Sequence, residues 1–226
     1  MSGILKKLFT KRGPEPGQGG LYRDKHLPRV LDCVLEGCEY VVGTGDGAAS
    51  MLAGLGARHT RLECLACEPN SEKCFAVQNS AANLKNVYVH NKTPGKFLQL
   101  IKADKPYLFS RDVLFLLSAA GGGAERRMLG EIEFVTGHFS AAFMLVHGFK
   151  VPDRDEFTFE VQRGRACSFE NIKKSLGTAE YSLFYPAYPV RASLRRSVMG
   201  WGLFAFGRNA GHEFPGDVSA FLTKAG

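Results

Sequence analysis

The chain has 226 residues, of which 45% are hydrophobic and 23% are charged, so it can bury one sizeable core. No stretch approaches the roughly 18 apolar residues of a membrane-spanning helix, and the basic start lacks the long apolar stretch of a signal peptide. The net charge of +7 is compatible with acidic partners, but no nucleic-acid-binding motif accompanies it. We therefore expect one cytoplasmic domain that binds no nucleic acid.

The first 20 residues differ in composition from the rest. Residues 1–12 combine apolar side chains with four cations, a pattern that suits an amphipathic helix at a membrane surface or in a partner's groove. A solvated N-terminus has the same pattern, and we favour this interpretation. Because residues 13–20 are rich in glycine and proline, we expect a basic segment and linker over 1–20 and a single domain over 21–226.

The six cysteines predict neither disulfides nor a zinc site. Cys64 and Cys67 have the spacing of a C-x-x-C motif, but they fall in an expected strand, where residues three apart point to opposite faces. No second such pair and no histidine cluster completes a zinc site. Buried, reduced thiols of a cytoplasmic protein are the expected state.

Strands and helices alternate along most of the chain. After a helix at about 27–35, strands are expected at 39–42, 62–67, 86–90, 112–117 and 141–146. Helices are expected between them at 48–55, 71–83, 94–102 and 124–135, and Ser71 is the expected N-cap of the second of these. The tail is expected to form a helix over 168–176 and an antiparallel pair of strands, 181–185 and 198–206, at the sheet edge. This alternation predicts a mostly parallel α/β sheet with helices on both faces, in which ligands bind at the carboxyl ends of the strands.

A glycine-rich turn follows the first strand and reads Gly43-Thr44-Gly45-Asp46-Gly47. Three glycines at alternate positions let the backbone turn sharply and approach a ligand closely. The helix that follows would direct its free N–H groups at that ligand. Ordinary strand-to-helix turns also contain glycine triplets, so this motif alone does not decide between them.

Glu68 ends the second strand, 25 positions after Gly43. A carboxylate at this place can accept hydrogen bonds from both hydroxyls of a ribose, so the turn and Glu68 together predict a nucleoside-type ligand. The glycine pattern also suits a dinucleotide, but Asp46 would place a carboxylate in the turn that has to hold a pyrophosphate, where like charges repel. S-adenosylmethionine has no phosphate and carries a sulfonium. Asp46 therefore favours S-adenosylmethionine over a nicotinamide cofactor.

From Leu27 to Phe206 the chain resembles the class I S-adenosylmethionine-dependent methyltransferases, and more narrowly their FkbM-like and sugar- or antibiotic-tailoring branch. The resemblance rests on residues 41–47, 68–70, 114–123 and 145–152, taken in this order and spacing. It implies a Rossmann-like methyltransferase fold with a mostly parallel, seven-stranded sheet and helices on both faces. It also implies S-adenosylmethionine as cofactor and a small molecule or sugar as methyl acceptor. Glu68 would then hold the cofactor ribose, and the glycine turn would pass beneath the methionine part.

Several positions at the strand ends depart from the pattern of this family. Val41 stands where related sequences carry an acid, and Asn91 with Lys92 stands where a Gly-Asp pair contacts adenine. Leu117-Ser118-Ala119-Ala120 aligns with Leu-Asp-Ala-His, and His147-Gly148-Phe149 aligns with Asp-Asp-Phe. The carboxylates and the histidine that could bind a metal or take a proton from a substrate hydroxyl are thus missing at the matching positions. We expect no metal, and Asn91 as the candidate for the adenine contact.

Two side chains remain as candidate catalytic groups. His147 titrates near neutral pH and could replace the missing base, although a hydrogen-bonded histidine at a strand end is the simpler explanation. Ser118 is a weak acid without an evident base, so it makes a poor proton acceptor.

Three functions follow from these residues. The first is methyl transfer to oxygen or nitrogen of a small molecule or sugar, driven mainly by proximity and alignment, with His147 as the base. The second is a catalytically degenerate relative that serves as a binding or scaffold protein. The third, disfavoured by Asp46, is a nicotinamide-dependent oxidoreductase. In each case the aromatic edge strand of the tail could form a homodimer surface.

Overall fold

The computed structural model describes residues 24–45, 47–118, 124–162, 164–190 and 198–225. The expected N-terminal segment and linker (1–20), and with them the membrane or partner contact of residues 1–12, lie outside the described residues. Asp46 and residues 119–123 lie outside them as well.

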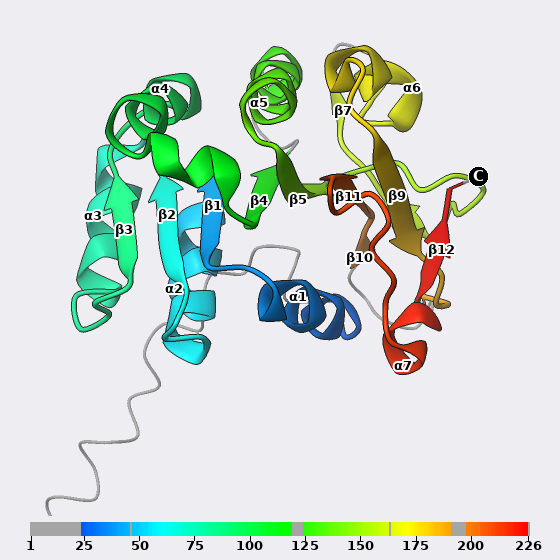
Figure 1. Ribbon diagram of the computed structural model, residues 1–226, viewed down its shortest axis with the longest axis horizontal. Coiled ribbons are helices and arrows are strands. Elements are labelled where there is room, and N and C mark those ends of the chain that lie inside the picture. The colour runs from blue at the N-terminus through cyan, green and yellow to red at the C-terminus, as the bar shows by residue number, and fades with distance from the viewer. Residues whose placement is uncertain (1–23, 46, 119–123, 163, 191–197, 226) are drawn as a thin grey trace, which may run out of the picture.

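An eight-stranded sheet forms the centre of the molecule, in the order β12-β9-β11-β5-β4-β1-β2-β3 (Figure 1). Its strands are β1 (Tyr40–Thr44), β2 (Glu63–Cys67), β3 (Val87–His90), β4 (Val113–Ser118), β5 (Ala141–His147), β9 (Tyr181–Pro186), β11 (Trp201–Gly207) and β12 (Leu222–Lys224). The first five strands pair in parallel. β11 lies antiparallel between β5 and β9, and β12 pairs antiparallel with β9.

The helices cover both faces of this sheet, with α1 and α2 on one side and α4 and α5 on the other (Figure 1). They are α1 (Leu27–Glu36), α2 (Ala48–Arg58), α3 (Ser71–Ser80), α4 (Pro94–Asp104), α5 (Ala124–His138), α6 (Phe169–Ile172) and α7 (Gly216–Ser219). The 3-10 helix η3 (Pro106–Ser110) follows α4, and the 3-10 helix η4 (Lys173–Leu176) follows α6. Two short ladders complete the structure: β6 (Phe157–Thr158) with β10 (Val198–Met199), and β7 (Val161–Gln162) with β8 (Arg165–Ala166).

The predicted α/β fold is confirmed, with three local corrections. The sheet has an eighth strand, β12, in addition to the seven expected. The strand expected at 198–206 is divided at Gly200, where a Cβ would lie 2.4 Å from the carbonyl oxygen of Phe149. The N-cap of α3 is Asn70 rather than Ser71, because the Asn70 side chain accepts a hydrogen bond from the Lys73 backbone N–H at 2.9 Å.

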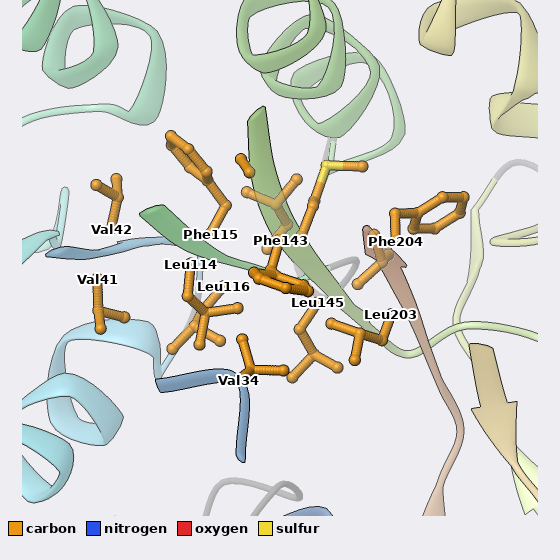
Figure 2. Packing of buried hydrophobic residues seen from close by; sticks show 14 of the residues in the cluster. Val34, Val41, Val42, Leu114, Phe115, Leu116, Phe143, Leu145, Leu203 and Phe204 are labelled. Atoms are coloured by element: carbon orange, nitrogen blue, oxygen red, sulfur yellow. The ribbon is translucent and has the colours of Figure 1, made fainter. Parts of the chain in front are cut away.

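The core lies on both faces of the central strands. Every residue of β4 and β5 is buried, as the continuous apolar sequence of β4 predicts. Val41 and Val42, which are neighbours in β1, point to opposite faces, and Val34 of α1 lies below Leu116 and Leu145 (Figure 2). Within the part of the chain that the structure describes, no helix is both long and apolar enough to cross a membrane.

All six cysteines are free, and five of them are buried. Burial raises the pKa of the Cys38, Cys64 and Cys67 thiols to about 12. These thiols therefore stay protonated near neutral pH and have the low reactivity of structural cysteines.

Candidate functional site

The carboxyl ends of β2, β1 and β4 lie side by side. In the parallel register Gly43 lies beside Ala66 of β2, and Thr44 lies beside Leu117 of β4. From β1 the chain continues to β2 and β3 on one side of the sheet and then returns to add β4 and β5 on the other, so a topological switch point lies between β1 and β4. Open α/β sheets bind their ligands in the crevice at such a point.

The glycine turn is tight at one position and open at another. Gly45 has φ +93°, and a Cβ there would lie 2.9 Å from the Cβ of Ser118, so the turn runs against the end of β4. Gly47 has φ +79° and is the N-cap of α2, but a Cβ there would meet nothing within 4 Å among the described residues. Gly43 packs on α2, where a Cβ would lie 2.7 Å from Leu52. The turn thus leaves the start of α2 accessible, while two of its glycines fit against neighbouring elements.

Thr44 points away from the expected ligand and into the protein. Its hydroxyl is fully buried and donates a hydrogen bond of 2.9 Å to the carboxylate of Glu131 in α5. Glu131 is only 2% exposed, and burial raises the pKa of this carboxyl group to about 7, against the opposing charge of Arg127 and the Thr44 hydrogen bond.

Arg127 links the same carboxylate to β4. Its Nε lies 3.4 Å from Glu131, one helical turn away, and its guanidinium donates a hydrogen bond of 3.1 Å to the carbonyl oxygen of Ser118. The ends of β1 and β4 are therefore both attached to α5 through one ion pair, in which Glu131 is buried and Arg127 is partly exposed.

Glu68 lies directly after β2 and is buried to 5% exposure. Its Oε1 accepts a hydrogen bond of 2.9 Å from the backbone N–H of Asn70. Among the described residues, no donor reaches its second carboxylate oxygen. This oxygen is not one of the fully buried atoms without a partner, so a ligand or water can reach it.

Asn91 follows β3 and holds the Glu68 turn in place. Its side-chain amide donates to the carbonyl oxygens of Glu68 and Pro69 at 2.9 and 3.2 Å, and its carbonyl oxygen accepts from the Ser71 hydroxyl at 3.2 Å. Both of its N–H donors are thus used within the protein. The geometry gives Asn91 a supporting position beside Glu68, and an adenine contact would have to use its remaining acceptor capacity.

Ser118 and His147 end neighbouring strands and lie beside each other in the β4–β5 register. His147 in turn lies beside Trp201 of β11. The Nε2 atom of His147 is buried and has no hydrogen-bond partner among the described residues. Burial lowers the pKa of His147 to about 4, although the charge of Asp24 opposes this shift. His147 is therefore a neutral imidazole at physiological pH.

Asp24 joins the start of α1 to the far end of the chain. One carboxylate oxygen accepts the backbone N–H groups of His26 and Leu27, at 2.9 and 3.0 Å. The other accepts the Tyr188 hydroxyl and, at 2.9 Å, the Trp201 indole N–H. Four donors thus compensate the buried charge next to His147.

Comparison with known proteins bears on the fold. No protein-family description and no curated protein matches the sequence. Among solved structures, the chain is similar to N-methyltransferase NodS from Bradyrhizobium japonicum WM9, with 12% identity, a TM-score of 0.51, and coverage of 84% of this chain and 97% of that one. It is also similar to an rRNA methylase from Streptococcus thermophilus, with 12% identity, a TM-score of 0.50, and coverage of 81% and 97%. The chain has the Rossmann-like fold of methyltransferases.

Within this methyltransferase fold, the roles of three charged residues were not expected from the sequence: buried Asp24, buried Glu131 and partly exposed Arg127. Arg127 and Glu131 have the i, i+4 spacing of a helical ion pair in the helix that follows the second glycine run. That spacing was the available signal, but such pairs usually lie on solvated helix faces. Asp24 stands three residues before Leu27, which is a capping distance. Its contacts with Tyr188 and Trp201 span 164 and 177 positions, and no local pattern predicts them.

Proposed function

We propose that this protein binds S-adenosylmethionine at the ends of β1, β2 and β4 and transfers its methyl group to oxygen or nitrogen of a small molecule or sugar. The observation that carries this proposal is the Glu68 carboxylate. This residue is 5% exposed at the end of β2 and is fixed through one oxygen, while the other oxygen has no described donor and is not fully buried. A ribose hydroxyl supplies the missing donor.

The residues around Glu68 fit such a cofactor. Glu68 would hold the ribose, and Asn91 would keep its turn in place. The glycine turn would support the methionine part, because Gly45 permits a close approach to the end of β4 and Gly47 leaves space at the start of α2. Asp46, which lies outside the described residues, would carry the charge that favours a sulfonium over a pyrophosphate.

When bound, S-adenosylmethionine would supply an electrophilic methyl group: the acceptor's lone pair would form a bond to the methyl carbon, the bond from that carbon to sulfur would break, and S-adenosylhomocysteine would leave. What the chain contributes is alignment and a place for the acceptor's proton. Neutral His147 can accept a hydrogen bond at Nε2 from an N–H or O–H group of the acceptor. Because its pKa is lowered to about 4, it is a weak base. It therefore suits an amine, or an oxygen that is already acidic, better than an aliphatic alcohol.

Calorimetric titration of the full chain with S-adenosylmethionine, S-adenosylhomocysteine and NADH tests this proposal. We expect micromolar binding of the first two and none of NADH. We also expect EDTA to leave the affinity unchanged, since the described residues hold no group of three His, Cys, Asp or Glu side chains that could bind a metal. Binding of NADH alone would instead support the nicotinamide-dependent oxidoreductase.

Substitution of Glu68 tests the ribose contact. Glu68→Ala should weaken S-adenosylhomocysteine binding by about 100-fold, because two hydrogen bonds to a charged acceptor are lost. Glu68→Gln should lose less. Glu72→Ala is the matched control, since Glu72 is an exposed carboxylate in the first turn of α3. Unchanged affinity in Glu68→Ala would remove the ribose assignment.

A second function, a non-catalytic binding or scaffold protein, is favoured by the low basicity of His147. The two functions share the cofactor site and differ in turnover. Methyl transfer from labelled S-adenosylmethionine to a panel of small amines, phenols and sugars separates them. Tight cofactor binding without transfer to any acceptor class would support the scaffold.

A further inference from the structure

We propose that Glu131 and Arg127 of α5 are positioning residues for the cofactor site, and that they make cofactor binding depend on pH. This inference rests on the proposed function. Neither side chain is expected to touch the cofactor. They act through Thr44 and Ser118, the last residues of β1 and β4.

The geometry supports this assignment on both strands. The Thr44 hydroxyl donates to Glu131 at 2.9 Å, and Arg127 donates to the Ser118 carbonyl oxygen at 3.1 Å. The two α5 side chains lie 3.4 Å apart. Between the strand ends runs Gly45, where even a Cβ would lie 2.9 Å from Ser118. The backbone ladder already pairs β1 with β4, and this ion pair attaches the last residue of each strand to α5. A small shift of either strand end changes the turn on which the cofactor would lie.

The ionisation of Glu131 makes this arrangement sensitive to pH. The charged and titratable groups that face the carboxylate are Arg127 on its own helix and Cys67 at the end of β2, while β1 contributes the Thr44 hydroxyl. Cys67 stays protonated, because its pKa is raised to about 12. Among the described residues, Arg127 is thus the charged group that faces the Glu131 carboxylate. Ionised Glu131 pairs with Arg127, and protonated Glu131 does not.

The pH arm of the test uses S-adenosylhomocysteine and the full chain. Wild-type affinity should fall about fivefold when the pH is lowered from 8 to 6, because Glu131 becomes protonated across its pKa near 7. Glu131→Gln should bind more weakly than the wild type at pH 8 and show a flat pH profile. Glu133→Gln is the matched control: it lies two residues away on the exposed face of α5 and accepts a hydrogen bond from Ser175, far along the chain. This control should keep the wild-type affinity and pH profile.

The Thr44 arm separates positioning from general stability. Thr44→Val keeps the shape but removes the donor to Glu131, and should weaken binding about tenfold. Thr44→Ser keeps the hydroxyl and should restore affinity to within about threefold of the wild type. If the wild type binds and Thr44→Val and Glu131→Gln both bind within twofold of it at both pH values, the positioning role is overturned.

Hydrogen exchange of peptides that contain Gly45 or Ser118 adds a measurement that needs no ligand. Thr44→Val should exchange faster than the wild type in both peptides, and Glu133→Gln should not. Equal exchange in Thr44→Val and wild type would overturn the positioning role even where binding changes. A wild type that binds no cofactor but shows the expected exchange pattern would refute the proposed function and the pH-dependent binding, and leave only the mechanical link between α5 and the strand ends.

Discussion

Two buried side chains, Glu131 of α5 and His147 at the end of β5, have pKa values that are shifted in opposite directions. The pKa of Glu131 is raised to about 7 in the folded chain, and that of His147 is lowered to about 4. Between pH 4.5 and 7 the unfolded chain loses the Glu131 proton more readily than the folded chain does. The contribution of Glu131 to the free energy of unfolding therefore falls as the pH rises from about 4.5 to 7. Between pH 6.5 and 4 the unfolded chain binds a proton at this histidine, whereas folded His147 stays neutral. The contribution of His147 to the free energy of unfolding is therefore lost as the pH falls from about 6.5 toward 4. The two slopes overlap and partly cancel.

Single substitutions should reveal each slope. Relative to the wild type, Glu131→Gln should gain stability as the pH rises from 4.5 to 7, by up to about 3 kcal/mol. His147→Gln should lose stability relative to the wild type as the pH rises from 4 to 6.5, by a similar amount. Urea unfolding at four pH values from 4 to 7.5 measures both differences. The lowered pKa values of His90 and His212 add the same background to every variant and drop out of the comparison. Parallel curves for the wild type and both variants would contradict the assignment.

At the scale of the elements, the glycine turn can be tested by two matched substitutions. Gly45 and Gly47 both have positive φ, but a Cβ would collide with Ser118 only at Gly45. Gly45→Ala should therefore lose about 2–4 kcal/mol of unfolding free energy, from backbone strain and the forced movement of β4. Gly47→Ala should lose only about 1 kcal/mol, from strain alone. Thermal or urea unfolding compares them, and equal losses would mean that the contact between the turn and β4 is loose.

The elements themselves were largely predictable, because helices and buried strands carry their signals locally. The five parallel strands and their helices lie where the alternation of apolar runs and turn residues places them, with ends shifted by a few residues. β12 was not expected, since three partly exposed residues carry no recognisable period. The N-cap of α3 was assigned one residue late, because Asn70 and Ser71 are both good capping residues and only the backbone angles of Asn70 decide between them.

The candidate site was predictable in its backbone and not in its buried contacts. The turn and Glu68 stand at the expected strand ends. Thr44 belongs to the turn that was expected beneath the cofactor, but its hydroxyl faces Glu131. That contact joins residues 87 positions apart, and so depends on how α5 packs on the sheet. The state of His147 likewise depends on burial by distant elements, which a sequence pattern does not report.

On the scale of the whole molecule, Asp24 ties the two ends of the fold together. Its carboxylate caps the start of α1 and accepts hydrogen bonds from Tyr188, in the loop after β9, and from Trp201 at the start of β11. Trp201 is fully buried and lies beside His147 in the sheet. The end of β5 that carries His147 therefore lies beside a contact between residues that are far apart in the sequence. The Asp24 carboxylate accepts four hydrogen bonds, two at each oxygen, and no neutral side chain has two such acceptor oxygens.

Asp24→Asn should accordingly destabilise the fold far more than its small change in shape suggests. An amide can present only one acceptor oxygen, so Tyr188 or Trp201 is left facing an N–H group, at a cost of about 3 kcal/mol. Asp32→Asn is the control, because Asp32 is an exposed carboxylate of α1 whose only described partner is His59 at 3.1 Å, and it should lose less than about 0.5 kcal/mol. Urea unfolding at pH 7.5 compares the two. If Asp24→Asn loses less than about 1 kcal/mol, the carboxylate is not what joins α1 to β11, and packing of Trp201 and Tyr188 alone would have to hold that side of the site.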